Sequence, residues 1–199
     1  MKVAIVVGHH PMSRGAQATD GAHEYDMNLV LAHQIVSTMC PTIEARKFVH
    51  TAGGRASQVL GQTVDELNDW GADVVVELHW NAAVDANGNR ATFFWTASHS
   101  VIFKGSDKAR ELGFLLSTAC AGALGTDDMG VRVRESGYPM LRDTTGAAVI
   151  LETHNGLDEE SHDAFVAALA DGSLAFNIRR AVMAYCEGSD GPRGASIQA

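Results

Sequence analysis

Three apolar segments of this chain lead into side chains that can bind a metal ion or move a proton. They lead into His9, His79 and Glu152. The segments are residues 3–7, 73–78 and 147–151. Each is typical of a buried strand, because apolar and β-branched residues follow one another without a break. Ligands of open α/β sheets bind at the carboxyl ends of the strands. If the three strands run parallel, two imidazoles and a carboxylate share one rim of the sheet.

Imidazole nitrogens and carboxylate oxygens are the donors of a catalytic zinc ion, which takes three protein ligands and a water. The missing third ligand is expected nearby, and Glu24 is the candidate, because it opens the first long predicted helix. A carboxylate at a helix start is also stabilised by the helix dipole, so both interpretations of Glu24 stay open. The contiguous metalloprotease motif is absent, since Met27 stands where its second histidine would be.

Four short motifs follow one another over roughly residues 3–156. They are Gly8-His9, Glu24 with Asn28-Leu29 four residues later, His79-Trp80-Asn81-Ala82 and Ile150-Leu151-Glu152. In order and spacing they resemble the zinc-dependent N-acetylmuramoyl-L-alanine amidases of the amidase-3 type. The resemblance implies a zinc ion held by His9, Glu24 and His79, with Glu152 as the catalytic carboxylate. It also implies the substrate, the amide that joins N-acetylmuramic acid to L-alanine in bacterial peptidoglycan.

The first motif is shorter than in the family, which has Asp-Pro-Gly-His-Gly-Gly. Here Gly8-His9 is kept and a second histidine, His10, follows. His9 and His10 are therefore both candidates for the first ligand, and the Gly-His alignment favours His9.

Glu77 replaces a small residue of the family pattern two positions before His79. Residues two apart on a strand point to the same side of the sheet. Glu77 is thus a candidate to orient the His79 ring by a hydrogen bond. The alternative is a partly exposed strand residue without such a role.

Other polar and aromatic residues near the motifs are candidates for substrate contact. Asn81 belongs to the third motif. His154 follows Glu152 by two residues and is a candidate to contact the substrate or that carboxylate; the alternative is a histidine in a loop without such a role. Trp80 and Tyr138 are candidates to present a flat apolar surface to a sugar or peptide, whereas Trp95 is expected in the core.

Three arginines precede the strand that carries Glu152. Arg142, together with Arg132 and Arg134, is a candidate partner for anionic groups of the muropeptide. The alternative is a set of solvated loop charges, which is the more common case.

The elements that must position these residues alternate along the chain. Helices are predicted over residues 22–39, 56–70, 106–124 and 158–185, the last with a break near Gly172. Further strands are predicted over residues 43–49 and 91–96, and residues 126–145 are expected to be irregular. The alternation predicts one three-layer α/β domain: a twisted, mixed, mostly parallel sheet with helices on both faces. Residues 1–186 form the predicted catalytic domain, and residues 187–199 a flexible C-terminal tail.

Composition narrows the class of protein. The 199 residues are 46% hydrophobic and carry a net charge of −9, which argues against binding to nucleic acid or to anionic membranes. The three cysteines are too few for a disulfide framework or a thiolate zinc cluster. The chain has no apolar run long enough to span a membrane, so membrane insertion is not expected.

The first residues lack the features of a signal peptide. We therefore expect synthesis in the cytoplasm and action on the cell wall after release, as in a monomeric phage endolysin. A recycling amidase inside the cell and a secreted effector are alternative settings. Two alternative functions are a related zinc amidohydrolase acting on a small acylated amino acid and a non-catalytic module that binds the wall.

Overall fold

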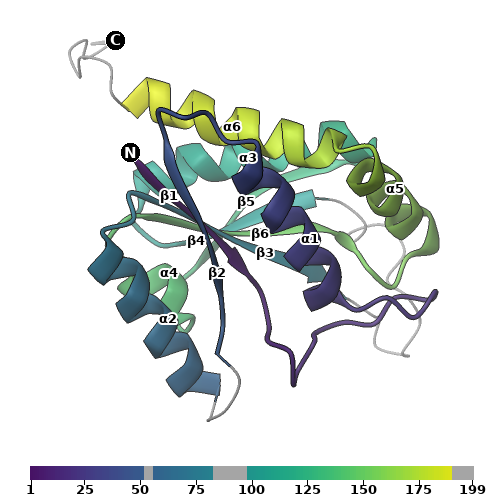
Figure 1. Ribbon diagram of the computed structural model, residues 1–199, viewed down its shortest axis with the longest axis horizontal. Helices are drawn as coiled ribbons and strands as arrows, with labels where there is room; N and C mark the ends of the chain where they lie inside the picture. The colour runs from purple at the N-terminus through teal and green to yellow at the C-terminus, as the bar shows by residue number, and fades with distance from the viewer. Residues whose placement is uncertain (52–55, 83–97, 190–199) are drawn as a thin grey trace.

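A mixed six-stranded sheet, in the order β2-β1-β3-β6-β4-β5, forms the middle layer of the structure (Figure 1). Its strands are β1 (Lys2–Val7), β2 (Glu44–Val49), β3 (Val74–Asn81), β4 (Ser98–Phe103), β5 (Asp128–Arg134) and β6 (Ala147–Asn155). The first four strands in spatial order are parallel, while β4 runs antiparallel to β6 and parallel to β5. This computed structural model describes residues 1–51, 56–82 and 98–189.

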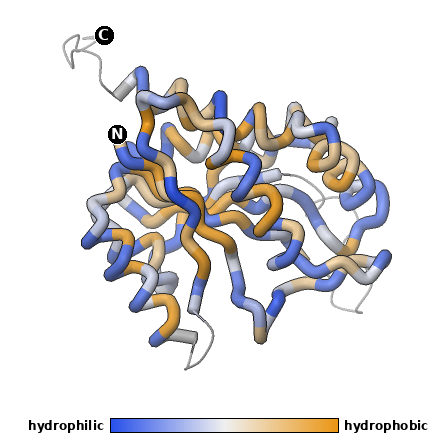
Figure 2. Tube along the Cα trace, viewed as in Figure 1, coloured by the Kyte–Doolittle hydropathy of each residue, from blue (hydrophilic) through white to orange (hydrophobic). Residues whose placement is uncertain are grey.

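Helices cover both faces of this sheet. One face packs against α1 (Glu24–Ser37), α3 (Asp107–Leu124), α5 (Glu159–Ala170) and α6 (Ser173–Ser189), and the other against α2 (Ala56–Trp70) and α4 (Pro139–Asp143). Hydrophobic residues line the strands and the helix sides that meet them (Figure 2). The three-layer α/β fold with a mostly parallel sheet is confirmed.

The central strands are apolar on both sides because each side meets a layer of helices. In β1, Val3, Ile5 and Val7 belong to the core beneath α1 and α3, whereas Ala4 and Val6 belong to the core beneath α2 and α4. Continuous apolar runs are the expected pattern for strands buried on both faces.

Capping residues and glycines mark the beginning and the end of helices at the predicted positions. The Ser106 side chain caps α3 by accepting a hydrogen bond from the Ala109 amide, and Gly125 ends that helix with φ of 65°. Gly172, with φ of 78°, separates α5 from α6 at the predicted break. The last helix continues to Ser189, so the first three residues of the predicted tail are helical.

The expectation that residues 126–145 are irregular is wrong. They contain β5 and the short helix α4. β5 is an edge strand that stays partly exposed, so it lacks the apolar run of the inner strands, and its pairing with β4 defines it instead. The predicted strand over residues 91–96 and the environment of Trp95 lie outside the described residues. β4, which follows, was not predicted.

The parallel strands β1, β3 and β6 all end at the same rim of the sheet. The side chains that follow these three strands are therefore close together in space.

Within the described residues, no helix is long and apolar enough to cross a membrane.

Candidate metal centre and active site

His9 lies in the turn that leaves β1. The Gly8 amide donates to the Leu78 carbonyl at 3.0 Å, which ties this turn to β3. His9 itself has φ of 66°, a left-handed conformation that non-glycine residues rarely adopt and that is common at functional sites. Its Nε2 atom lies 3.1 Å from Oε2 of Glu24.

Glu24 is the first residue of α1, and its side chain is only 2% exposed. Backbone amides hold both carboxylate oxygens: Trp80 donates to Oε1 at 2.8 Å and Ala16 donates to Oε2 at 3.0 Å. The carboxylate is therefore fixed between the β1 loop and β3, facing His9 and His79.

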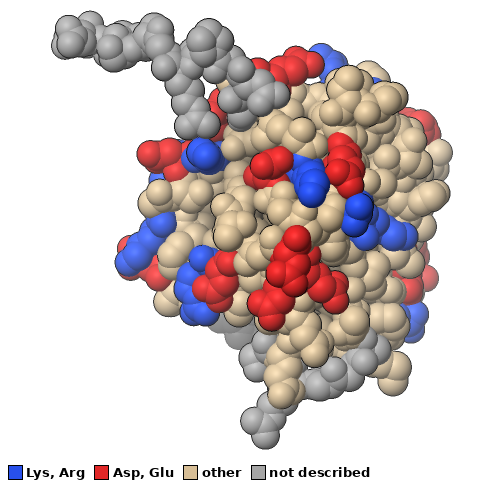
Figure 3. All heavy atoms as spheres, turned by 60° about the vertical axis from the view of Figure 1, so that its left-hand side comes forward, with Lys and Arg blue, Asp and Glu red and all other residues tan. Residues whose placement is uncertain are grey.

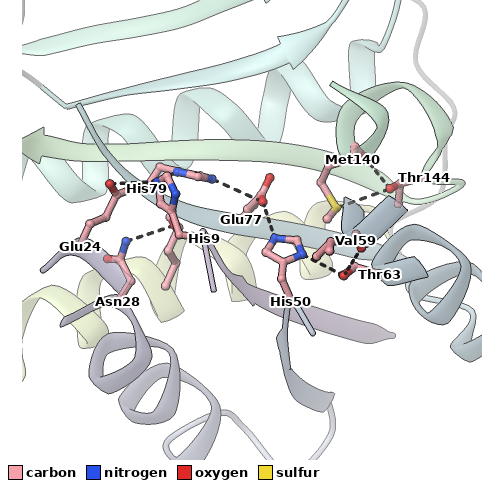
Figure 4. A network of polar contacts seen from close by, with 11 residues as sticks. His9, Glu24, Asn28, His50, Val59, Thr63, Glu77, His79, Met140 and Thr144 are labelled. Atoms are coloured by element: carbon pink, nitrogen blue, oxygen red, sulfur yellow. Dashed lines mark hydrogen bonds and ion pairs between the residues drawn. The ribbon is translucent and has the colours of Figure 1, made fainter. Parts of the chain in front are cut away.

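His79 completes the cluster from β3. Its Nδ1 atom lies 3.0 Å from Oε1 of Glu24, and its ring meets the His9 ring edge-on, with centroids 5.0 Å apart (Figure 4). One ligand atom from each of His9, Glu24 and His79 lies within 4.8 Å of the other two.

The donor set fits a zinc ion. Tetrahedral zinc with bonds near 2.1 Å separates its ligand atoms by about 3.4 Å. The two histidines lie slightly closer than this to Glu24: His9 is 3.1 Å from Oε2 and His79 is 3.0 Å from Oε1. Glycines leave room around the cluster, because a Cβ at Gly8 would collide with the His79 ring and one at Gly15 with Glu24 and His9.

Electrostatics keep the carboxylate charged. Burial alone would raise the pKa of Glu24, but hydrogen bonds from His79 and His9 lower it well below its ordinary value. Burial acts in the opposite sense on His79, yet Glu24 and Glu77 raise the pKa of that imidazole well above its ordinary value. A metal ion bound at His79 would need the lone pair of a neutral imidazole, so it would compete with a proton for this ring.

Glu152 stands beside the cluster without joining it. It is the register partner of His79 in the pairing of β3 with β6. Its Oε2 atom is buried and has no hydrogen-bond partner among the described residues. Burial raises the pKa of Glu152; the charge of His79 opposes this rise, and those of Glu24 and Glu77 add to it. A carboxylate with a raised pKa and an unpaired oxygen is suited to accept a proton.

His10 and Asn81 flank the cluster. The His10 ring turns back into its own loop, where Nδ1 accepts a hydrogen bond from the Met12 amide at 3.3 Å. The structure thus brings His9, and not His10, to Glu24. Asn81 ends β3, and its backbone carbonyl accepts a hydrogen bond from the Gly156 amide at 3.0 Å.

Glu77 is 1% exposed, so its interpretation as a partly exposed strand residue is wrong. Its Oε1 atom lies 3.4 Å from Nε2 of His79 and 3.0 Å from Nε2 of His50 (Figure 4). Burial alone would raise the pKa of Glu77, but hydrogen bonds from His50 and His79 lower it to about 2. Sequence reasoning missed His50, although it also follows a strand, β2, at the same rim.

His154 is neither a loop residue nor a neighbour of Glu152 on the same side of the sheet. Between the pairs His79–Glu152 and Asn81–Asn155, β6 contains one residue more than β3. This bulge reverses the alternation of side chains. His154 is completely buried on the α5 side, stacked on Phe165 with ring centroids 4.2 Å apart.

Trp80 offers no surface to a substrate, because it is 4% exposed and packs edge-on against His154, His162 and Phe165. Its side chain alternates with that of His79 and so enters the opposite core. Tyr138 is half-buried before α4, with a left-handed φ of 55°.

The three arginines are not loop charges on an irregular segment. Arg132 and Arg134 lie on β5, and the Arg134 guanidinium sits 5.2 Å from the Tyr138 ring centroid. Arg142 lies on α4, where two nitrogens of its guanidinium pair with Asp143 at the surface, the shorter contact being 2.6 Å.

Comparisons with known proteins show the family to which this fold belongs. The family model Amidase_3, described as N-acetylmuramoyl-L-alanine amidase, matches residues 3–181. An N-acetylmuramoyl-L-alanine amidase from Clostridium difficile 630 is 22% identical, with a TM-score of 0.77, and the match covers 96% of this chain and 98% of that chain. The catalytic domain of CwlV, an amidase of the same name from Bacillus (Paenibacillus) polymyxa var. colistinus, is 22% identical, with a TM-score of 0.75 over 94% and 99% of the two chains.

A third similar structure is the catalytic domain of the CD27L endolysin, described as targeting Clostridia difficile. It is 18% identical, with a TM-score of 0.70 over 92% of this chain and 97% of that chain. No curated protein sequence matches this chain significantly. Because the family model spans residues 3–181, nearly the whole described fold, the chain belongs to the N-acetylmuramoyl-L-alanine amidase family and is an enzyme that cleaves peptidoglycan.

Proposed function

We propose that this amidase is zinc-dependent, with His9, Glu24 and His79 as the metal ligands and Glu152 as the general base and acid. The observation that carries the proposal is the pairing of His79 with Glu152 in register, beside three ligand atoms within 4.8 Å of one another. The scissile bond is the amide between N-acetylmuramic acid and L-alanine.

When bound, zinc polarises the scissile carbonyl and makes an attacking water more acidic. The buried Oε2 of Glu152 takes the proton of that water. The water oxygen bonds to the carbonyl carbon, the C–N bond breaks, and Glu152 returns the proton to the leaving amine. The products are the carboxylate of the lactyl group and the free amino group of L-alanine. Glu24 stays fixed throughout by the Ala16 and Trp80 amides.

For the biological setting we propose an endolysin-like enzyme: a monomer made in the cytoplasm that reaches the wall after release. The likeness to the catalytic domain of the CD27L endolysin, of which this chain covers 97%, is compatible with that role. Expression in a bacterial host with and without a membrane-permeabilising protein tests it. Lysis only with the permeabilising protein supports the setting, whereas lysis without it or no lysis in either case contradicts it.

The chemistry is tested with the purified protein and purified peptidoglycan sacculi. The proposal expects zinc bound at one equivalent, new L-alanine amino groups, no new reducing sugars, loss of turnover after chelation and recovery with added zinc. Turnover that survives complete chelation would overturn the zinc dependence. Release of amine from small acylated amino acids but not from sacculi would favour the related small-molecule amidohydrolase.

A further inference from the structure

A buried line of polar side chains connects α2 to the candidate metal centre. Thr63 Oγ1 lies 2.8 Å from Nδ1 of His50, whose Nε2 lies 3.0 Å from Oε1 of Glu77. The same Glu77 oxygen lies 3.4 Å from Nε2 of His79. Figure 4 shows the line running from Thr63 to His79 and on to Glu24.

The hydrogen positions along this line follow from its chemistry. A carboxylate only accepts, so the nitrogens of His50 and His79 that face Glu77 carry the hydrogens. Nδ1 of His50 faces the Thr63 hydroxyl, which also donates a hydrogen bond to the Val59 carbonyl at 3.2 Å. Nδ1 of His79 also faces a carboxylate oxygen, Oε1 of Glu24 at 3.0 Å. A metal ion bound between these two atoms would take the lone pair of Nδ1 and leave the hydrogen of the ring on Nε2, facing Glu77. Among the described residues, the buried Nε2 of His79 makes no hydrogen bond of standard geometry, and its contact with Glu77 is an ion pair at 3.4 Å.

These polar side chains are buried, and burying them costs stability. Thr63, His50 and Glu77 are each at most 3% exposed, on the side of the sheet covered by the apolar residues of α2 and α4. Buried charged and polar groups cost stability, and a well-packed apolar set of similar volume is often as stable. Stability alone therefore does not account for an acid and an imidazole at these positions.

We propose that Glu77, held in place by His50 and Thr63, positions the His79 ring with Nδ1 toward the metal and so strengthens metal binding. The inference rests on the proposed zinc site. It assigns His50 and Thr63, which no motif singles out, to the support of a ligand that belongs to another strand. It also couples the placement of α2 to the metal centre.

The test measures zinc affinity rather than turnover alone. Glu77→Gln keeps the shape and removes the charge, His50→Phe keeps a ring without donors, and Thr63→Val keeps the volume without the hydroxyl. Loss of such supporting groups weakens metal binding about 10- to 100-fold, so we expect a loss in this range for Glu77→Gln. We expect a smaller loss for His50→Phe and the smallest for Thr63→Val. Chelator competition gives the dissociation constants, and the visible spectrum of the Co²⁺-loaded protein reports a change in ligand geometry.

His162→Phe is the matched control. His162 is a buried, hydrogen-bonded histidine on the opposite side of the sheet, so its loss should leave zinc affinity within about twofold of wild type, far below that range. Thermal unfolding of each metal-free variant shows whether it folds. If Glu77→Gln does not fold, His50→Phe decides the question.

Folded Glu77→Gln and His50→Phe proteins with wild-type zinc affinity and an unchanged Co²⁺ spectrum would overturn this inference and leave the zinc proposal standing. A wild-type protein that binds no zinc would overturn both. A graded loss in the order Glu77, His50, Thr63, with His162→Phe unaffected, supports the positioning role.

Discussion

His79 and Glu152 are register partners on the adjacent parallel strands β3 and β6. Neighbouring strands lie about 4.8 Å apart, so the backbone itself sets the distance from His79, the proposed metal ligand, to Glu152, the proposed proton acceptor. A slip of one residue in this pairing would turn Glu152 to the other face of the sheet. The placement of these two proposed site residues relative to each other thus depends on the register of two buried strands.

Glu152→Gln should nearly abolish peptidoglycan hydrolysis while the protein still binds zinc. The amide keeps the shape of the side chain but cannot take up a proton, and removal of a general base typically costs about 10²- to 10⁴-fold in rate. The release of L-alanine amino groups from sacculi and the metal content of the purified variant check both halves. Full turnover by zinc-loaded Glu152→Gln would rule out Glu152 as the base.

His79→Ala should lose the metal as well as the activity. The substitution removes one of three candidate ligands and leaves Glu24 facing His9 alone. Metal analysis after dialysis should find less than about a tenth of the zinc retained by wild type, because loss of even a group that supports a ligand weakens metal binding about 10- to 100-fold. An alanine variant that keeps stoichiometric zinc would remove His79 from the ligand set.

The sequence predicts the central part of this molecule well, for a physical reason. Strands buried on both faces are continuously apolar, and where parallel strands end, polar residues are conspicuous. His9, His79 and Glu152 were found in this way. β5 was not predicted, because an edge strand is half-exposed and lacks a continuous apolar run. Its pairing with β4 is not visible in the local sequence either, since α3 lies between the two strands.

Two features of the site depend on contacts that no local pattern encodes. The bulge in β6 moves His154 to the opposite face from Glu152, although the two are only two residues apart. His50 reaches Glu77 because β2 and β3 lie on either side of β1. Strand order and register decide both, and neither is visible in the spacing of residues along the chain.

Gly15→Ala should disrupt the metal centre more than Gly21→Ala does. Both glycines have left-handed φ angles, 73° and 90°, so alanine is strained at either position. A methyl group at Gly15 would collide with Glu24 and His9, whereas at Gly21 it would meet nothing within 4 Å. Zinc affinity measured by chelator competition should fall for Gly15→Ala and stay near wild type for Gly21→Ala. Equal zinc affinities in the two variants would show that the room left by Gly15 beside Glu24 and His9 does not matter for metal binding.

Moderate added salt should change the rate of hydrolysis little. The chain carries a net charge of −9, and acidic side chains gather on the face in Figure 3 with basic ones scattered between them. Such a surface gains no long-range attraction to an anionic wall that salt could screen. Initial rates of sacculus solubilisation over a series of salt concentrations check this, and marked slowing by salt would be inconsistent with it.

His154 should make the protein less stable as the pH falls below about 6.5, the ordinary pKa of histidine. Burial, helped by the charge of His162, lowers the pKa of His154 well below that value. Below about pH 6.5 this histidine binds a proton in the unfolded chain but stays unprotonated in the folded protein. The free energy of unfolding therefore decreases as the pH falls, by up to about 1.4 kcal/mol per pH unit. Urea unfolding from about pH 7.5 to about pH 5 should show this slope in wild type and a shallower one in His154→Phe, which keeps an aromatic ring against Phe165. The exposed His33 gives the control, since His33→Gln should retain the wild-type slope. Equal slopes for wild type and His154→Phe would show that this buried imidazole does not control acid stability.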